Sequence, residues 1–202
     1  MMNIIKTNFK TKFGPLAFVI FGSVFNPQAQ ASEFNFIQLH GMQATYGDIP
    51  GFELRGAEIR GGFGWNQFFT EFRYRSLDDR SGDRKLEDER WNISVGYAWP
   101  LSANLSVDLR ANYGSIKLEG HGPDEYFISK PKYEGLSSYL HYSYSDNISL
   151  YGGLEWQNLP ENADQKAYHL GAMYQFEVIT LGAEYTKYSD TDAISLFARY
   201  QF

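Results

Sequence analysis

The feature that most constrains this chain is a period-two alternation of apolar and polar residues, over segments about ten residues long. The clearest segment is 90–99, where small or polar residues separate five apolar ones: Trp91, Ile93, Val95, Tyr97 and Trp99. Because successive side chains of a β-strand point to opposite faces, this pattern predicts strands with one apolar and one polar face. The pattern recurs, clearly or in part, in further segments: 34–46, 53–63, 68–75, 105–113, 136–144, 148–156, 168–176, 179–185 and 194–202.

Ten such strands predict an all-β fold, a transmembrane antiparallel up-and-down β-barrel. A strand crosses a bilayer with about 9–11 residues at a tilt of about 45°, whereas strands of soluble proteins usually have about 5–6 residues. In 34–46 apolar residues occupy both faces, so its parity stays unassigned. Counting the first two strands or the 166–187 hairpin differently gives an eight-stranded alternative. Alternation does not give direction, so a soluble lipocalin-like barrel with its apolar rows inward is the rival.

The connections between the predicted strands alternate in length. We expect short turns at 64–66, 100–104, 145–147 and near Glu177, and longer loops at 47–52, 78–89, 119–132, 157–165 and 188–192. Outer-membrane barrels have short periplasmic turns and longer extracellular loops. If the barrel starts in the periplasm, every short turn falls on that side and every longer loop falls outside. An even strand number then brings both termini to the periplasmic side.

Aromatic residues make up 17% of the chain, yet the mean hydropathy is −0.42. Many aromatics in a polar chain argue against a helical membrane protein and favour an amphipathic barrel with aromatic girdles at the two membrane interfaces. The predicted girdle residues stand near strand ends: Trp91, Trp99, Tyr113, Tyr144, Trp156, Tyr168, Phe176 and Tyr200.

The first 31 residues have the pattern of a cleaved signal peptide. Three lysines precede an apolar run at 13–25, and Ala29-Gln-Ala31 follows, as signal peptidase requires. We expect a signal peptide at 1–31 and a barrel domain at 32–202, exported to the bacterial outer membrane. The whole chain carries −6, so removing three lysines leaves −9, which argues against a nucleic-acid partner. The chain has no cysteine, which excludes disulfides and thiol ligands.

The C-terminal segment 193–202 alternates apolar residues up to Tyr200 and Phe202. It resembles the terminal strand signal that the outer-membrane assembly machinery recognises. With the Gly-Tyr and Ala-Tyr rhythm of 95–97, 150–154 and 181–185, the chain resembles small outer-membrane barrels of the opacity-protein and OmpA/OmpX-like type. The resemblance implies partners in outer-membrane lipids, lipopolysaccharide and the assembly machinery. It also implies adhesion, surface protection, narrow pores or structural roles.

The predicted inward rows carry a set of charges expected to pair across the lumen, because small barrels fill their interior with side chains. These residues are Glu58, Arg60, Glu71, Arg73, Arg75, Asp108, Arg110, Glu155, Glu184 and Arg199, with His169 beside them. A solute path through the same charges is the alternative.

Three smaller groups suggest chemistry. His141, Ser143 and Glu155 are similar to the His-x-Ser…Glu arrangement of lipid A deacylases, but Tyr144 stands where those enzymes carry Asn. The predicted topology also keeps the three residues apart. His121, with Asp124 and Glu125, has the residue types of a cation site, and Arg80, Arg84 and Lys85 suit lipopolysaccharide phosphates.

The sequence as a whole predicts a monomeric, non-catalytic barrel with a structural or surface-interaction role and a possible extracellular ligand at its loops. No cofactor and no metal are expected. A narrow pore is the first alternative, and a lipid A-modifying hydrolase is the second.

Overall fold

The computed structural model describes residues 34–49, 51–123, 126–160 and 163–202. The expected signal peptide at 1–31 and its cleavage after Ala31 lie outside the described residues. Among the described residues, no helix is long and apolar enough to cross a membrane.

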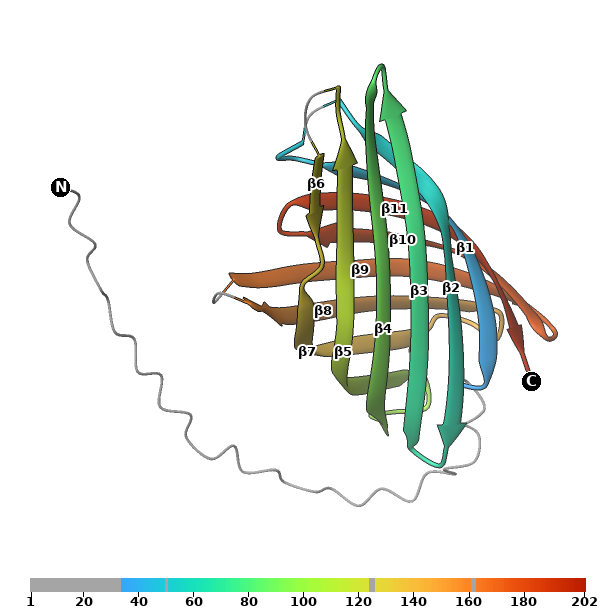
Figure 1. The fold of residues 1–202 in the computed structure, drawn as a ribbon. Coiled ribbons are helices and arrows are strands. Elements are labelled where there is room, and N and C mark those ends of the chain that lie inside the picture. The colour runs from blue at the N-terminus through green and yellow to red at the C-terminus, as the bar shows by residue number, and fades with distance from the viewer. Residues whose placement is uncertain (1–33, 50, 124–125, 161–162) are drawn as a thin grey trace.

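The described chain forms one antiparallel sheet that closes into a barrel of ten strands (Figure 1). Sequence neighbours pair around the ring, β11 pairs with β1, and β5 pairs with β7. The ring strands are β1 (Phe36–Tyr46), β2 (Glu53–Trp65), β3 (Phe68–Ser81), β4 (Arg84–Pro100), β5 (Leu105–His121), β7 (Lys132–Ser143), β8 (Ile148–Leu159), β9 (Ala163–Phe176), β10 (Ile179–Tyr188) and β11 (Thr191–Gln201). The short strand β6 (Tyr126–Ser129) lies outside the ring against the end of β5. The ten-stranded prediction is confirmed, and the eight-stranded alternative is wrong.

The two ends of the barrel differ, and we call them the turn end and the loop end. The turn end holds the tight connections 66–67, 101–104, 144–147 and 177–178, together with the beginning of β1 and the end of β11. Asn66 and Glu177 have positive φ values of 57° and 52°, which suits tight hairpins. The other connections, including 47–52, lie at the loop end. The predicted alternation of ends is confirmed, although the first turn lies at 66–67 rather than 64–66.

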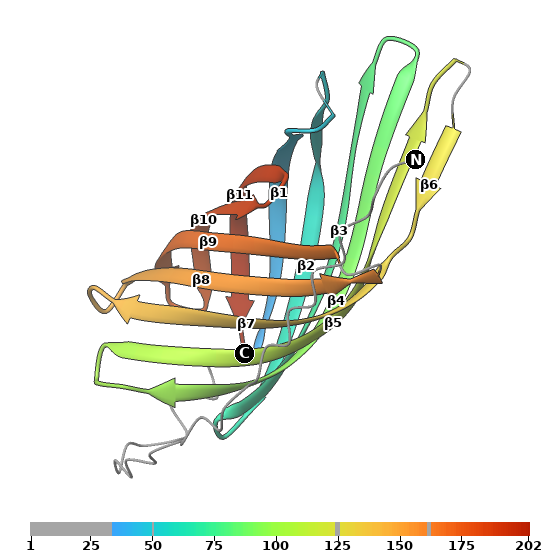
Figure 2. The ribbon, with the colours of Figure 1, turned by 90° about the vertical axis from the view of Figure 1, so that its left-hand side faces the viewer.

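Four of the predicted long loops are largely strand, so the prediction of loops there is wrong. Residues 78–89 form the tip of the β3–β4 hairpin, where 82–83 make the turn. Residues 119–132 contain β6, and the segments 157–165 and 188–192 are mostly the ends of β8, β9, β10 and β11. These strand ends lack the apolar–polar alternation, because outward side chains beyond the apolar band face water and can be charged. The barrel therefore protrudes at the loop end as β-structure, highest at β3–β6 (Figure 2).

The apolar rows face outward, as a membrane barrel requires and a lipocalin-like barrel does not. Near the turn end, outward residues such as Leu39, Phe63 and Leu196 are 59%, 60% and 69% exposed. The parity of β1 is now assigned, with Ile37 and Leu39 outward and Gln38 and His40 completely buried inside.

The aromatic girdle residues mark the two edges of this outward apolar band. Trp99, Tyr144, Phe176 and Tyr200 lie beside turn-end connections or the end of β11. Trp91, Tyr113, Trp156 and Tyr168 lie where the outward row turns polar. The next outward residues toward the loop end are Glu89, Ser115, Asn158 and Lys166. The rings of Trp91 and Tyr113 meet edge to face at 5.7 Å. The band edges therefore fall where interfacial aromatics belong.

The interior changes character between the two ends. Within the band it is mainly polar and charged, with a small apolar cluster of Phe34, Phe69 and Ala98 near the turn end. At the loop end it is a larger apolar cluster: Met42, Ala44, Tyr46, Phe52, Leu54, Leu77, Leu86 and Ala193, with Ile49 and Leu118 packed against it. Leu54, Leu77 and Leu86 have at most 1% of their surface exposed. We call this group the loop-end core.

Candidate functional site

The structure places all ten predicted lumen charges on the inward face. Eight of them are buried, while Arg73 and Arg199 are partly exposed. They form several groups that contain partners from non-adjacent strands, which sequence spacing alone does not reveal.

The central group joins β2 to β10. Arg60 donates to both carboxylate oxygens of Glu184, over 2.7 and 3.1 Å, and also to Glu58. Tyr151 of β8 donates its hydroxyl to the same Glu184 carboxylate. Because β1 and β11 separate β2 from β10 in the sheet, these bonds join strands that are not neighbours in the barrel wall. Such charge-assisted bidentate bonds are the strongest available to an arginine.

The second group lies closer to the turn end. Arg110 donates over 2.7 and 2.9 Å to the two carboxylate oxygens of Asp108 and over 3.2 Å to Glu71. Arg73 donates to the other oxygen of Glu71. The guanidinium of Arg110 also lies 4.3 Å from the ring centre of Tyr139. Each charge in this group is therefore satisfied by a neighbour.

The third group lies just below the loop-end core, and its central residue, Asp88, is not among the predicted lumen charges. Asp88 is fully buried and accepts bonds from Arg75 over 2.7 Å, from Arg90 over 3.0 Å and from the hydroxyl of Tyr46. The sequence predicts a loop at Asp88, because 78–89 mixes charges of both signs. The alternation along β4 predicts the inward position, because Asp88 stands an even number of residues from Asn92 and Ser94, which also point inward.

The three residues of the deacylase-like pattern are not brought together. His141 bonds Asp108 over 2.8 Å, whereas Glu155 bonds His169 over 3.2 Å and Gln157 over 2.7 Å. Ser143 lies opposite Ser149, six residues along β8 from Glu155, which corresponds to about 20 Å. A Ser–His–carboxylate relay needs hydrogen-bond contact, and this geometry does not provide it. The absence of enzymatic activity nevertheless stays a prediction.

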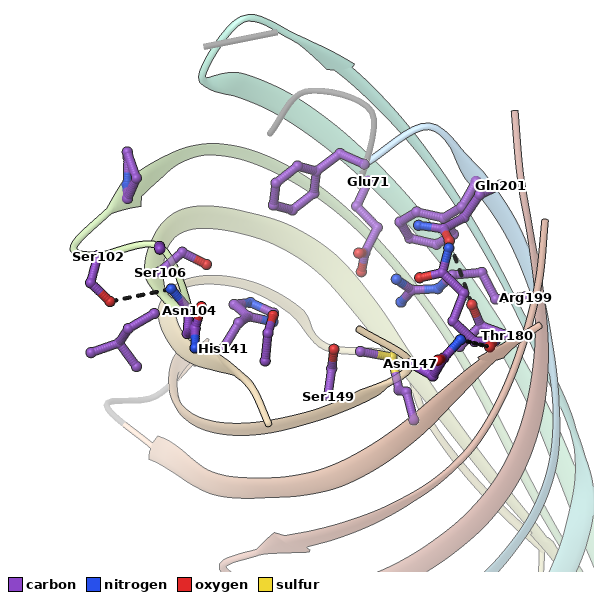
Figure 3. A pocket seen from close by; sticks show the side chains of 18 of the residues that line it. Glu71, Ser102, Asn104, Ser106, His141, Asn147, Ser149, Thr180, Arg199 and Gln201 are labelled. Atoms are coloured by element: carbon purple, nitrogen blue, oxygen red, sulfur yellow. Dashed lines mark hydrogen bonds between the residues drawn. The ribbon is translucent and has the colours of Figure 1, made fainter. Parts of the chain in front are cut away.

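The last predicted lumen charge, Arg199, borders a cavity of about 360 Å³ at the turn end (Figure 3). Its Nε donates to Gln38 over 2.7 Å, and its guanidinium lies 4.1 Å from the ring centre of Phe36. Within the described chain, every other lumen arginine forms an ion pair with a carboxylate, and Arg199 forms none. Phe34 also lines the cavity and stacks on Phe69 at 3.9 Å.

The protrusion at the loop end carries the remaining candidate features. Strand β6 pairs with β5 alone among the described strands, so its other edge has no strand neighbour. Its side chains Tyr126, Phe127 and Ile128 are 59%, 47% and 42% exposed. Tyr126 donates to Glu119 over 3.1 Å, and Lys117 pairs with Glu119 at 2.8 Å. The hydrogen bond from Lys117 is the main reason that the pKa of Glu119 lies below its ordinary value.

The predicted cation residues are placed differently from expectation. His121 lies next to Glu119 and Glu87 on the surface, while Asp124 and Glu125 lie outside the described residues. Lys85 pairs with Glu87, and Lys117 with Glu119, so nearby lysines already neutralise these carboxylates. The absence of a metal stays a prediction.

The predicted lipopolysaccharide contacts sit at the tip of the β3–β4 hairpin. Arg84 lies 5.2 Å from the ring centre of Phe52, and Arg80 faces Lys85 across the hairpin. Lys85 is six residues beyond Trp91, or about 20 Å along the strand. The tip therefore extends well past the aromatic edge of the apolar band.

The sequence matches no family model and no curated protein. Solved structures do match. The NanC porin superposes with a TM-score of 0.55 at 8% identity, covering 82% of this chain and 100% of that one. The β-domain of the Bordetella autotransporter BrkA gives 0.52 at 10% identity, covering 83% and 98%. Neisserial surface protein A gives 0.46 at 10%, covering 83% and 95%. The two likenesses with TM-scores above 0.5 establish, at these identities, the fold alone, that of a membrane β-barrel.

Proposed function

We propose that the protein is a non-conducting barrel of the bacterial outer membrane that acts at the cell surface through its protruding strands. The observation that carries this proposal is the division of the molecule into a filled interior and an exposed strand edge. The expected signal peptide and the outward apolar band support export to, and insertion in, the outer membrane. In this orientation the turn end faces the periplasm.

The filled interior supports a structural role over a narrow pore. Inside the band, Arg60 and Glu184 connect two strands that are not neighbours in the wall. The loop-end core fills the interior above them with apolar side chains. A solute following the charged residues would have to separate buried ion pairs, which costs several kcal/mol, and would then meet apolar side chains. A polar channel needs a continuous hydrated path, and this arrangement opposes one.

The edge of β6 supports binding of an extended segment of an extracellular protein. An exposed strand edge presents unpaired backbone groups that such a segment bonds by adding a strand. Tyr126, Phe127 and Ile128 supply apolar contacts beside that edge, and aromatic residues contribute strongly to protein interfaces. Large apolar side chains exposed together beyond the lipid band favour an interaction surface over a purely structural one.

Lipopolysaccharide is the proposed membrane partner, through Lys166 and Lys187 rather than through Arg80, Arg84 and Lys85, which the sequence suggested. Lys166 pairs in register with Trp156, and Lys187 with Tyr168, so both lie at the aromatic edge of the band. Phosphate groups of the outer leaflet lie at this level, whereas Arg80 and Lys85 extend beyond it. We also retain the assembly machinery as the partner of the terminal strand that contains Tyr200 and Phe202.

Planar-bilayer recording tests the closed lumen. Purified protein is expected to give no discrete openings, and a regular conductance altered by Arg60→Ser would contradict the proposal. Binding of cells or extracellular matrix to vesicles carrying the protein tests the surface role. Tyr126→Asp combined with Ile128→Asp should abolish binding, whereas Arg80→Ser at the β3–β4 tip serves as the matched control. Equal binding by both variants would exclude β6 as the contact.

A further inference from the structure

We infer that the turn-end cavity is a binding site for a small anion, a carboxylate or a phosphate, held by Arg199. This inference is independent of the loop-end surface, because the cavity lies at the opposite end of the barrel. It rests on the cavity, on the charges of its walls and on donor groups that no described residue satisfies.

The charge of the cavity wall is positive. Among the described residues that line it, Arg110 and Arg199 are cations and Glu71 is the single carboxylate, with His141 as a further titratable group. Glu71 already accepts bonds from Arg73 and Arg110. No carboxylate of the wall is therefore left over to neutralise Arg199.

Arg199 is held in place but only partly satisfied. Its Nε bonds Gln38, and Phe36 supports the flat face of its guanidinium. Its two terminal nitrogens have no hydrogen-bond partner among the described residues, although a guanidinium carries five donors. A planar fork oriented in this way matches the two oxygens of a carboxylate or phosphate. Because the orientation is fixed beforehand, little conformational entropy is lost on binding.

The opposite wall offers hydroxyl groups. Ser106, Ser143 and Ser149 line the cavity with side chains that have no hydrogen bond within the described chain, and Figure 3 shows Ser149 and His141 bordering the same hollow as Arg199. Hydroxyls donate readily to the remaining oxygens of an anion. A volume of about 360 Å³ lies at the lower end of the range of ligand pockets, so an inorganic phosphate or a short carboxylic acid has room to enter it.

The test is nuclear magnetic resonance of the arginine Nε–H groups in the full chain, folded in detergent. Sodium phosphate and sodium acetate are titrated separately against sodium chloride at constant ionic strength, so the two arms distinguish the anion. Saturable movement of the Arg199 signal with either anion, but not with chloride, is the expected result. Movement that does not saturate, or that chloride reproduces, would overturn the proposal in the unmodified protein, independently of any variant.

Variants then locate the site. Arg199→Gln should weaken binding about tenfold or more, as expected for the loss of a bidentate charged contact. Ser149→Ala should weaken it by a smaller factor without removing a charge. Arg55→Gln is the matched control, because Arg55 is an exposed arginine at the loop end, paired with Glu53, and should leave binding unchanged. Unchanged binding in Arg199→Gln would also overturn the assignment.

Discussion

Arg60 of β2 and Glu184 of β10 form a two-pronged ion pair across the lumen, at 2.7 and 3.1 Å, although two strands of the sheet separate them. Both side chains have less than 10% of their surface exposed. This pair connects strands on either side of the β1–β11 closure, so its removal is expected to weaken the closed ring rather than one hairpin.

Arg60→Ala should lower the free energy of unfolding by about 3–5 kcal/mol, because it leaves Glu58 and Glu184 buried without their cation. Urea titration of the protein in lipid vesicles measures the change. The matched control is Arg55→Ala, which breaks the exposed pair with Glu53 on the same strand and should cost about 0–1 kcal/mol. Equal costs for the two variants would show that the lumen pair contributes no more than a surface pair.

Arg110→Ala should be similarly destabilising. It removes the bidentate partner of Asp108 and one of the two partners of Glu71, and it also removes the cation above the Tyr139 ring. We expect a loss of about 3–5 kcal/mol, measured by the same titration. Arg110→Met with Asp108→Leu should recover much of the loss, because buried charges are then absent rather than unpaired. A double variant no more stable than Arg110→Ala would contradict this explanation.

Gly153→Ala should destabilise the barrel by about 1–3 kcal/mol through overpacking. A methyl group at Gly153 would fall against the Tyr139 ring, which is buried beneath Arg110. Gly41 is the control, since nothing lies within 4 Å of a methyl group placed there. Gly41→Ala should be neutral or slightly stabilising, because alanine loses less backbone entropy than glycine. Thermal unfolding of the two variants side by side checks the difference.

Acid should loosen β6. The pKa of Glu119 is lowered mainly by its hydrogen bond with Lys117, so this stabilising contribution is present above the ordinary pKa of glutamate. It is lost as the pH falls through the lowered value. Amide hydrogen exchange of 126–129, corrected for the intrinsic effect of pH, should show protection that decreases in this range. In Glu119→Gln, protection should be lower and should not change with pH. A pH response that persists in this variant would assign it to another group.

Trp156 should lie at a membrane interface. It is 38% exposed at the edge of the apolar band, beside Lys166. In a variant that keeps only this tryptophan, fluorescence should be quenched more by lipids brominated near the headgroup than by lipids brominated deep in the chain. The reverse order would place the band at a different depth.

Much of the fold follows from the sequence because outward residues that contact lipid need to be apolar, which makes the alternation regular. Segments such as 90–99 and 148–156 alternate cleanly, and their strands and parity are as predicted. Beyond the apolar band, outward residues face water and this requirement no longer applies. The segment 78–89 therefore reads as a charged loop, although Leu77, Leu86 and Asp88 continue the inward row.

The site was less predictable for the same physical reason. The inward row tolerates both polar and apolar residues, so the row itself does not reveal which charges meet. The bonds from Arg60 to Glu184 and from Tyr46 to Asp88 join residues 124 and 42 positions apart. Pairing of β1 with β11 brings the first two residues together, and the curvature of the sheet from β1 to β4 brings the second two together. In β1 the inward row changes from Gln38 and His40 to Met42 and Ala44. This change explains why its parity was ambiguous.

The change from a charged to an apolar interior means that the same strands face lipid near the turn end and water at the loop end. These two surroundings make opposite demands on the side chains. Near the turn end, apolar side chains face outward and most charged side chains face the lumen, the reverse of a water-soluble protein. At the loop end, the same strands obey the rules of a water-soluble domain. Tolerance to substitution should therefore reverse along a single strand. In β2, a serine at the inward Leu54 should be harmful, whereas at the outward Arg55, next to it, a serine should be accepted. Nearer the turn end, charge becomes unacceptable at the outward Ile59 and indispensable at the inward Arg60.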